Sequence, residues 1–378
     1  MEEAVKLSTV KVAFLALAGL FIANIAIAAE PVKIIYANYI SPKHPTNAAL
    51  VKFFEKIEKE SKGGIDFQWH FGSSLLGAKD IPAGVRDGLA DSGYMLGIFV
   101  PSEMPVDNYI GDFIMLNDDA MAITGAINEL IILDCPQCKK EYEQDLKVKY
   151  LGSYSLTPYV MQCKKEFRSL KDLKGAKIRG FSSVAEMIKG MGAVPVGVTT
   201  SEMYEALDRG ILDCTAHMLA SQRNFSLGEV AKNVITTSLG GFMGGSMLNI
   251  RLDKWAELSS EQKSIVIKNL PAVISETTFN YLKLDKEVRT EMEAKGNKFY
   301  EADKNLAEFI AKFRKDYVEN RAVNKGKERG VKNPEEIKKK IVALKKKWQK
   351  LFDEHGRDQA TFEKLLWEHI YSKMGAQG

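Results

Sequence analysis

Residues 170–213 alternate strand-like and helix-like stretches, and this alternation restricts the fold more than any other feature of the sequence. Apolar runs of strand type are separated by stretches whose apolar residues recur every three or four positions, as on one face of a helix. Thr199 precedes the second helical stretch as an N-cap, and Gly192 and Gly210 end the two stretches. This succession predicts a parallel α/β unit. The expected elements are strands at 177–179, 194–198 and 211–212, and helices at 184–191 and from 199 onward.

The N-terminal part of the chain repeats this architecture. Its expected elements are strands at 33–37, 65–71 and 92–99 and helices at 47–60 and 81–89. Ligands of open α/β sheets bind outside the carboxyl ends of the strands. Two such lobes that face each other enclose a cleft, which is a common place for small-molecule sites. The expected fold class is therefore α/β, with two lobes and a ligand cleft between them.

Residues 1–29 have the pattern of an export signal. Lys6 and Lys11 supply positive charge, residues 12–27 form an apolar run, and residues 26–28 offer a small-x-small cleavage site. The run is short for a transmembrane anchor, and Asn24 interrupts it. We expect a protein that is exported to the periplasm.

The composition excludes several functional classes. Net charge is only +4, and no basic stripe is interleaved with aromatic residues, so no nucleic-acid partner is expected. The sequence contains no GxSxG, HExxH or P-loop motif, and its five histidines are scattered. We expect a protein that is not an enzyme and that uses no cofactor and no metal. The alternative, a secreted two-domain enzyme, would need a nucleophile–base pair or a metal cluster at the cleft.

Four segments together resemble one known family. They are DLKGAKIRG at 172–180, MGAVPVGVTTSEMYEALDRGILD at 191–213, FGSSLLGAKDIPAGVRDG at 71–88 and LDKWAELSSEQKSIV at 252–266. In order and spacing they are similar to the solute-binding proteins of TRAP transporters, the DctP-type family, over residues 32–318. The resemblance implies a periplasmic receptor that closes about a hinge on a small organic acid and delivers it to the membrane subunits of the transporter. A ligand-sensing partner of a membrane receptor is an alternative that the sequence does not separate from it.

The resemblance also implies that the chain crosses between the lobes more than once. The expected crossings are at 149–154 and 235–250, the latter rich in Gly and Ser. The expected organisation is a signal at 1–29, lobe 1 at 30–153 with part of 240–330 returning to it, lobe 2 at 154–239, a hinge return with long lobe-spanning helices at 240–330, and a helical C-terminal extension at 331–378.

Arg179 is the first candidate for ligand contact. It ends an expected strand and precedes a glycine and a helix start. A guanidinium at that place offers paired donors that match a carboxylate. A structural ion pair is the alternative, but the resemblance implies that Arg179 holds the position of the family's carboxylate clamp.

The sequence departs from the family pattern in two places. Members with more contacts to acids often have a second Arg on the strand before DLKG, whereas residues 159–163 contain none. The family commonly has Gly after the Asp at position 213 and Asn three residues further on, whereas this chain has Cys214 and His217. One basic anchor favours a monocarboxylate, such as an aromatic, keto or hydroxy acid, over the alternative of a C4-dicarboxylate. The other candidate ligand-binding residues are His217, Tyr154, Tyr159, Phe181, Met218 and Asn38, each of which could instead be structural.

The four cysteines are expected to form two structural disulfides in an oxidising periplasm. We favour the pairs Cys135–Cys138 and Cys163–Cys214. A redox centre or half of a zinc site is the alternative for the CxxC. An apolar helix rather than a strand is expected before it, and no second CxxC exists.

The C-terminal extension is expected to be helical. Asn333 and Pro334 mark a helix start, and the residues after them form one apolar stripe with a lysine-rich opposite face. This stripe could pack on its own chain, or it could form a homodimer.

Overall fold

The structure is a computed structural model, and it describes residues 30–42 and 44–375. The expected export signal lies outside these residues. Every helix and strand in the described part of the chain belongs to the unit formed by Val32–Gly378. In the described part of the chain, no helix has the length and hydrophobicity needed to cross a membrane.

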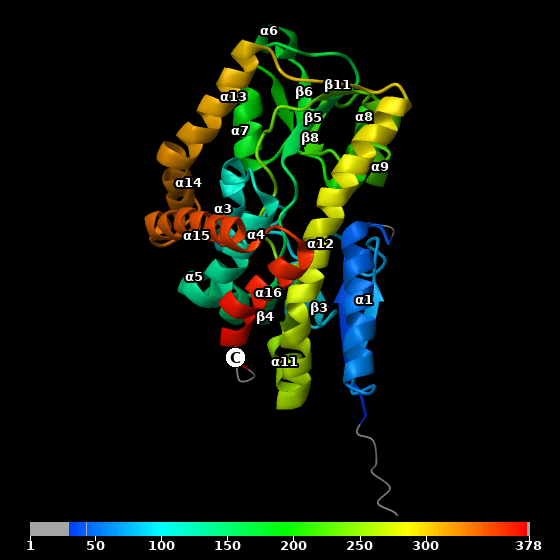
Figure 1. Ribbon diagram of the computed structural model, residues 1–378, viewed down its shortest axis with the longest axis vertical. Coiled ribbons are helices and arrows are strands. Elements are labelled where there is room, and N and C mark those ends of the chain that lie inside the picture. Colours follow the sequence, from blue (N-terminus) through cyan, green and yellow to red (C-terminus); the bar gives the residue numbers. More distant parts are fainter. Residues whose placement is uncertain (1–29, 43, 376–378) are drawn as a thin grey trace, which may run out of the picture. The chain divides into compact units, whose positions relative to one another are not determined.

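Two sheets form the centres of two lobes (Figure 1). The smaller sheet is parallel, with strand order β2-β1-β3. The larger sheet has strand order β11-β9-β5-β8-β6-β7, and β5 runs antiparallel to both of its neighbours. The strands of the smaller sheet are β1 (Val32–Ala37), β2 (Ile65–His70) and β3 (Ser92–Gly93). Those of the larger sheet are β5 (Tyr159–Cys163), β6 (Lys177–Arg179), β7 (Val194–Val196), β8 (Cys214–Met218), β9 (Asn233–Ile235) and β11 (Lys298–Tyr300).

The parallel unit predicted at 170–213 is confirmed, because β6 pairs in parallel with both β7 and β8. Two predicted strands were wrong in extent. Residues 211–212 belong to the turn after helix α8, where the Leu212 amide donates to Ala206 O, and the strand begins only at Cys214. The strand expected at 92–99 ends at Gly93, because the chain then bends toward Ser246, with which Met95 forms a bridge.

Helices cover both sheets. Those before residue 150 are α1 (Pro45–Glu60), α2 (Ile81–Arg86), α3 (Pro105–Gly111), η1 (Asp112–Leu116), α4 (Ala120–Glu129), η2 (Leu130–Asp134), α5 (Pro136–Lys139) and η3 (Lys140–Asp145). Those around the larger sheet are α6 (Leu170–Leu173), α7 (Ser182–Gly190), η4 (Thr200–Glu202), α8 (Met203–Asp208), α9 (Ser221–Asn224) and α10 (Leu227–Val230). The later ones are α11 (Leu252–Glu257), α12 (Ser260–Ala294), α13 (Lys304–Asp316), η5 (Tyr317–Arg321), α14 (Ala322–Glu328), α15 (Pro334–His355), α16 (Gln359–His369) and η6 (Tyr371–Lys373).

Two of the segments that connect the lobes leave and enter a small antiparallel ribbon. It consists of strands β4 (Val148–Gly152) and β10 (Leu248–Arg251), which pair with each other. The glycine-rich segment before β10 approaches the backbone of η1 closely. Gly240 has φ +88°, and a Cβ there would lie 2.3 Å from Ile114 O, so this position requires glycine.

Helix α12 spans both lobes (Figure 1). It packs on α1 beside the smaller sheet, while Arg223 of α9 pairs with Glu287 and Glu291 in its second half. The helix begins at Ser260 because Ser259 and Gln262 form a capping box, and Pro271 is buried inside it.

The C-terminal helices pack on their own chain. The apolar stripe of α15 lies on α4, and α16 lies on α12. Pro334 occupies the first turn of α15, but Asn333 makes no side-chain cap bond there, because it adopts a left-handed conformation. The side chain of Trp348 fills the space above Gly125 and donates to Glu129 at 2.9 Å.

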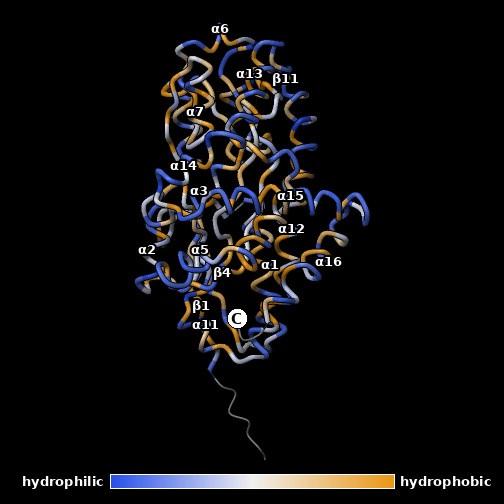
Figure 2. The backbone as a smooth tube through the Cα atoms, turned by 90° about the vertical axis from the view of Figure 1, so that its left-hand side faces the viewer, coloured by the Kyte–Doolittle hydropathy of each residue, from blue (hydrophilic) through white to orange (hydrophobic). Residues whose placement is uncertain are grey.

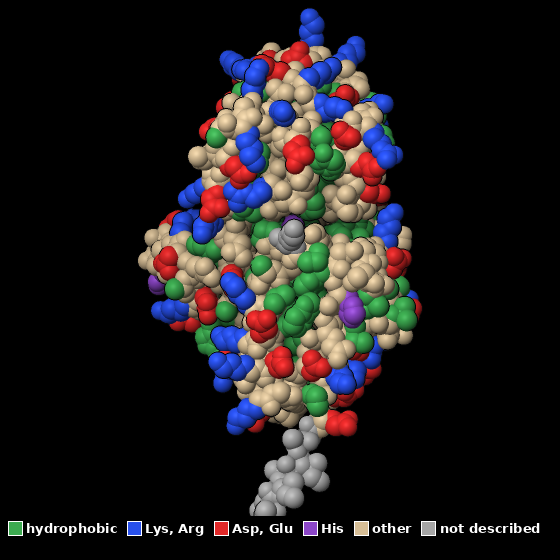
Figure 3. Space-filling view, turned by 90° about the vertical axis from the view of Figure 1, so that its right-hand side faces the viewer, with side chains coloured by type: hydrophobic (Ala, Val, Ile, Leu, Met, Phe, Trp, Pro, Cys, Tyr) green, Lys and Arg blue, Asp and Glu red, His purple; other side chains and the backbone are tan. Residues whose placement is uncertain are grey.

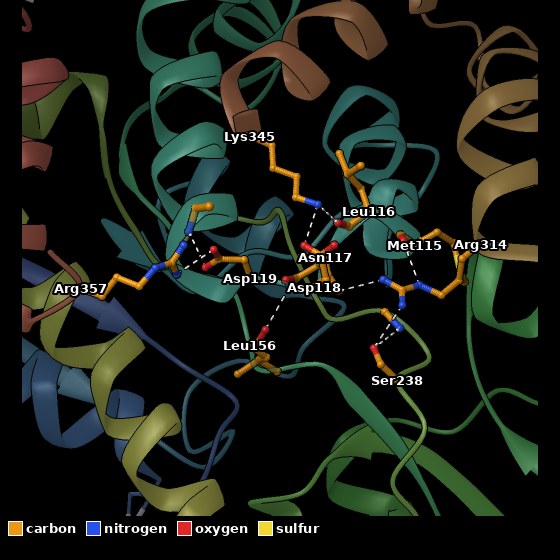
Figure 4. A network of polar contacts seen from close by, with 12 residues as sticks. Met115, Leu116, Asn117, Asp118, Asp119, Leu156, Ser238, Arg314, Lys345 and Arg357 are labelled. Atoms are coloured by element: carbon orange, nitrogen blue, oxygen red, sulfur yellow. Dashed lines mark hydrogen bonds and ion pairs between the residues drawn. The ribbon is translucent and has the colours of Figure 1, made fainter. Parts of the chain in front are cut away.

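Residues 115–119 join these helices to the lobe crossings (Figure 4). Arg314 of α13 donates to Met115 O and Asn117 O, and Lys345 of α15 pairs with Leu116 O and Asp118. The Asn117 amide in turn donates to Leu156 O, just after the first crossing, at 3.0 Å, and to Phe242 O, in the second crossing, at 3.3 Å. The C-terminal region therefore holds a segment that contacts the chain at both places.

Hydrophobic segments run through the interior of both lobes, and hydrophilic ones form the outer loops (Figure 2). One continuous core cluster includes residues of both sheets. On the face shown in Figure 3, charges of both signs are interspersed.

Candidate functional site

A cavity lies between the two lobes, at the strand ends of both sheets. It has an empty volume of about 900 Å³, including the part that opens to solvent. The structure brings Arg179, His217, Tyr159, Phe181, Met218 and Tyr154 together in its wall, as well as Tyr39, His44, Tyr94, Phe99, Phe225 and Tyr281.

Arg179 is a buried cation at the last residue of β6. Its side chain is turned toward the larger sheet, where Nε donates to Val198 O at 3.1 Å and one terminal nitrogen donates to Ala216 O at 3.4 Å. The residue is only 5% exposed, and burial lowers the pKa of its guanidinium. Within the described residues, no Asp or Glu forms an ion pair with it. A guanidinium has five N–H donors, so the remaining donors and the uncompensated charge suit an anion in the cavity.

The Phe181 ring lies beneath this guanidinium, with 4.9 Å between the guanidinium carbon and the ring centre. Phe181 also meets Phe99 of the other lobe edge to face at 5.9 Å. The two rings therefore close one wall of the cavity across the lobes.

His217 is a buried imidazole with an unused nitrogen. It stacks on Tyr159 at 5.1 Å, and Phe225 meets it edge-on at 5.7 Å. Its Nδ1 is buried and has no hydrogen-bond partner. Burial and the nearby Arg179 and His44 hold the pKa of His217 well below its usual value, so the ring is neutral at pH 7. A neutral imidazole offers one donor and one acceptor to a ligand.

Four tyrosines, Tyr39, Tyr94, Tyr154 and Tyr281, stack in a column along the cavity. Successive ring centres are 5.7, 6.2 and 5.7 Å apart. The Thr46 hydroxyl donates to the Tyr154 oxygen at 3.0 Å and bonds to the Tyr281 hydroxyl at 2.9 Å. Burial raises the pKa of each phenol, so the column presents uncharged aromatic faces and hydroxyl groups.

His44 stands at the end of this column and bonds to the Tyr281 hydroxyl at 3.0 Å. Burial lowers its pKa to about 3. Among the described residues that line the cavity, Arg179 is thus the one cationic side chain, since both histidines are neutral and no lysine takes part.

Asn38 does not line the cavity, although it follows β1 as expected. Its amide nitrogen donates to Asn47 at 2.8 Å, and its carbonyl oxygen accepts from the Ile40 amide at 2.9 Å. The side chain thereby fixes the loop after β1, which carries Tyr39 and His44 into the cavity.

Six of the lining residues named above were not predicted from the sequence: Tyr39, His44, Tyr94, Phe99, Phe225 and Tyr281. A signal existed for Tyr39 and His44, since both follow the carboxyl end of β1, where ligands of such sheets bind. No local signal identifies Tyr281, which lies in the middle of α12.

The two cysteine pairs that the sequence favoured are bonded in the structure. Cys163 and Cys214 are paired across β5 and β8, and Cys135 is joined to Cys138 beside α5. The first disulfide lies at the opposite end of these strands from Tyr159 and His217, so it ties the sheet together away from the cavity. Across the described ranges, no group of three or more His, Cys, Asp or Glu side chains could hold a metal ion.

Comparison with solved structures identifies the fold. The chain superimposes with a TM-score of 0.73 on a TRAP solute-binding protein from an unidentified marine microbe. That protein is specific for aromatic acid ligands and is bound to metahydroxyphenylacetate. The two chains are 21% identical, and the match covers 84% of this chain and 99% of that one. It superimposes with a TM-score of 0.71 on a TRAP periplasmic solute-binding protein of Bordetella bronchiseptica with bound mandelate, at 20% identity, over 85% of this chain and all of that one. The expected two-lobed fold class is confirmed.

Sequence comparison identifies the family. The C4-dicarboxylate-binding periplasmic protein DctP of Rhodobacter capsulatus is 25% identical over 244 residues, which cover 58% of this chain and 65% of that protein. The sequence model of the DctP family, bacterial extracellular solute-binding protein family 7, matches residues 36–325. Since this match spans most of the chain, the protein belongs to that family of TRAP-type periplasmic binding proteins, which serve transport and are not enzymes.

Proposed function

We propose that this protein captures a small organic monocarboxylate, with Arg179 as the clamp for the carboxylate. The observation that carries the proposal is a buried guanidinium that faces a cavity and lacks a counter-ion among the described residues. A buried charge of this kind is costly unless an ion pairs with it. A C4-dicarboxylate, as the relative in Rhodobacter capsulatus binds, is the second candidate, and the single cation of the lining argues against it.

The lining favours an aromatic acid, or a keto or hydroxy acid with an apolar body. Tyr154, Tyr159 and Phe181 offer ring faces, Met218 an apolar surface, and His217 a donor and an acceptor. Two structural neighbours are described with aromatic acids, which supports the same class. Asn38 is left out of the site because its side chain bonds to Asn47 and to the Ile40 amide and does not line the cavity.

The proposed mechanism is closure about the two crossings. In this proposal lobe 1 comprises residues 30–153 with part of 240–330 returning to it, and lobe 2 comprises residues 154–239. The ligand pairs with Arg179 on lobe 2, and lobe 1 then brings up Tyr39 and Tyr94 and excludes water, which strengthens the ion pair. Residues 1–29 would direct export, and the closed form would deliver the ligand to the TRAP membrane subunits. If the protein instead served in sensing, ligand capture would be the same, and the closed form would bind a membrane receptor in place of the TRAP membrane subunits. A homodimer through the C-terminal helices is not part of the proposal, because their apolar stripe packs on the same chain.

The test is a thermal-shift screen against aromatic, keto, hydroxy and C4-dicarboxylic acids, followed by calorimetric titration of the hits. A ligand at about a hundred times its Kd should add about 2.7 kcal/mol to the free energy of unfolding. Arg179→Ala should weaken binding by roughly 2–5 kcal/mol. Without ligand it should be no less stable than the wild type, since it removes an unpaired buried charge.

Arg209→Ala is the matched control, because that arginine, directly after α8, is exposed and pairs with Glu205 of α8. Its binding should equal that of the wild type. Wild-type affinity in Arg179→Ala, or a preference for dicarboxylates, would overturn the assignment.

A further inference from the structure

A polar contact joins the two proposed lobes beside Arg179, at the wall of the cavity. Asp112 of η1, in proposed lobe 1, accepts a hydrogen bond from the Ser182 hydroxyl of α7, in proposed lobe 2. The Ser183 hydroxyl donates to the backbone oxygen of the same aspartate at 3.1 Å. The start of α7 is therefore fastened to the opposite lobe.

Arg329 completes this contact from the turn after α14. One of its terminal nitrogens pairs with the Asp112 carboxylate, and the other donates to Ser182 Oγ at 3.0 Å. The Asp112 side chain is wholly buried and that of Arg329 is 20% exposed, so solvent screens the pair little. One guanidinium thus holds residues of both lobes at once.

The turn that carries Arg329 is firmly attached to lobe 1. Gly326 lies so close to the Tyr109 ring of α3 that a Cβ would come within 3.0 Å of it, and the Tyr109 hydroxyl donates to Pro334 O at 2.9 Å. Lys325 adds a second link toward α7, through Glu186 at 3.1 Å. The backbone that carries Arg329 is therefore held on lobe 1, and the side chain extends from it toward α7.

The contact adjoins the clamp directly. Ser182 follows Arg179, Gly180 and Phe181, and all four residues line the cavity. Ser182 has φ +51°, an uncommon conformation for a residue other than glycine. Such backbone persists only where surrounding contacts hold it, and here Asp112 and Arg329 supply them.

We propose that Arg329 is a positioning residue for ligand capture: with Asp112 and Ser182 it forms a rim latch that holds the cleft closed over the ligand and slows its release. Asp112 and Ser182 lie within residues 36–325, the part matched by the family model, whereas Arg329 lies beyond it, so the C-terminal segment contributes only the cation of the latch. The inference rests on the proposed function, because the ligand it retains is the carboxylate held by Arg179.

The test compares Arg329→Gln, Asp112→Asn and the double variant with the wild type in stopped-flow measurements of binding and release of the best ligand from the screen. Loss of the latch should raise koff about tenfold or more and change kon little, since interface changes act mainly on dissociation. The double variant should release the ligand no faster than the single ones, because both remove one contact. Arg329→Lys should restore koff in part.

Lys327→Gln is the control, because this neighbouring cation pairs only with exposed Glu335. Its koff should be that of the wild type. An unchanged koff in a folded Arg329→Gln variant would contradict the proposed latch. A change in kon as large as the change in koff in every variant would contradict it as well.

A second readout needs no ligand. Spin labels on exposed Lys59 of α1 and Lys189 of α7, each replaced by cysteine, report the distance between the lobes. The distance distribution should broaden toward longer values in Arg329→Gln and not in Lys327→Gln. If no acid binds the wild type, the proposed function fails, and this distance still decides whether the latch exists.

Discussion

At the scale of single residues, Asp285 of α12 links the stability of the fold to pH. The Asp285 carboxylate accepts a hydrogen bond from the amide of Ala220, just beyond β8, at 2.6 Å. Burial raises the pKa of this carboxyl group to about 6. The folded state therefore holds the proton more tightly than the unfolded chain does. This contribution to stability is present below the pKa of the unfolded state and is lost as pH rises through about 6.

Asp285→Asn keeps the acceptor oxygen and removes the titration. It should flatten the pH profile of the free energy of unfolding between pH 4 and 7, by up to about 3 kcal/mol relative to the wild type. Urea unfolding at several pH values measures this. Asp353→Asn, at a 73% exposed side chain, should leave the profile unchanged. Parallel profiles for wild type and Asp285→Asn would refute the prediction.

At the scale of secondary-structure elements, the seam between α15 and α4 depends on one glycine. A Cβ at Gly125 would lie 2.2 Å from the nearest ring atom of Trp348, and both residues are fully buried within this seam. Alanine normally stabilises a helix interior relative to glycine by roughly 1 kcal/mol. Here the clash should prevail, and Gly125→Ala should destabilise the protein by about 1–3 kcal/mol.

Denaturant unfolding checks this prediction. Gly111→Ala in α3 is the matched control, because its added carbon meets only Met243 O at 3.5 Å, an ordinary contact. Its stability should be close to that of the wild type or higher. A Gly125→Ala variant as stable as Gly111→Ala would show that α15 can shift without cost.

At the scale of the whole molecule, we expect a monomer. The apolar stripe of α15 (Ile337, Ile341, Leu344, Trp348 and Phe352) is buried against the same chain and is not available to a second copy. Light scattering after size exclusion should give the mass of one chain, with or without ligand. A dimer would contradict this, and loss of that dimer in Trp367→Lys would assign the contact to the exposed Trp367 of α16.

Local spacing made much of the fold predictable. The periodicities at 170–213 gave β6, α7 and β7 within a few residues, since a strand or a helix repeats over short distances. The errors occurred where a distant contact overrides the local pattern. The strand expected at 92–99 stops at Gly93 because Met95 pairs with Ser246, about 150 residues away.

The sequence by itself determined the α/β units, the family and the place of Arg179, because a strand end followed by a glycine and a helix start is a local arrangement. Only the tertiary structure decided which side chains surround that arginine. His44 and Tyr281 are 237 residues apart in the chain and yet share a hydrogen bond, and Arg329 reaches Asp112 across 217 residues. Such pairs depend on how whole helices pack, and the periodicity of a sequence carries no record of which distant segments meet.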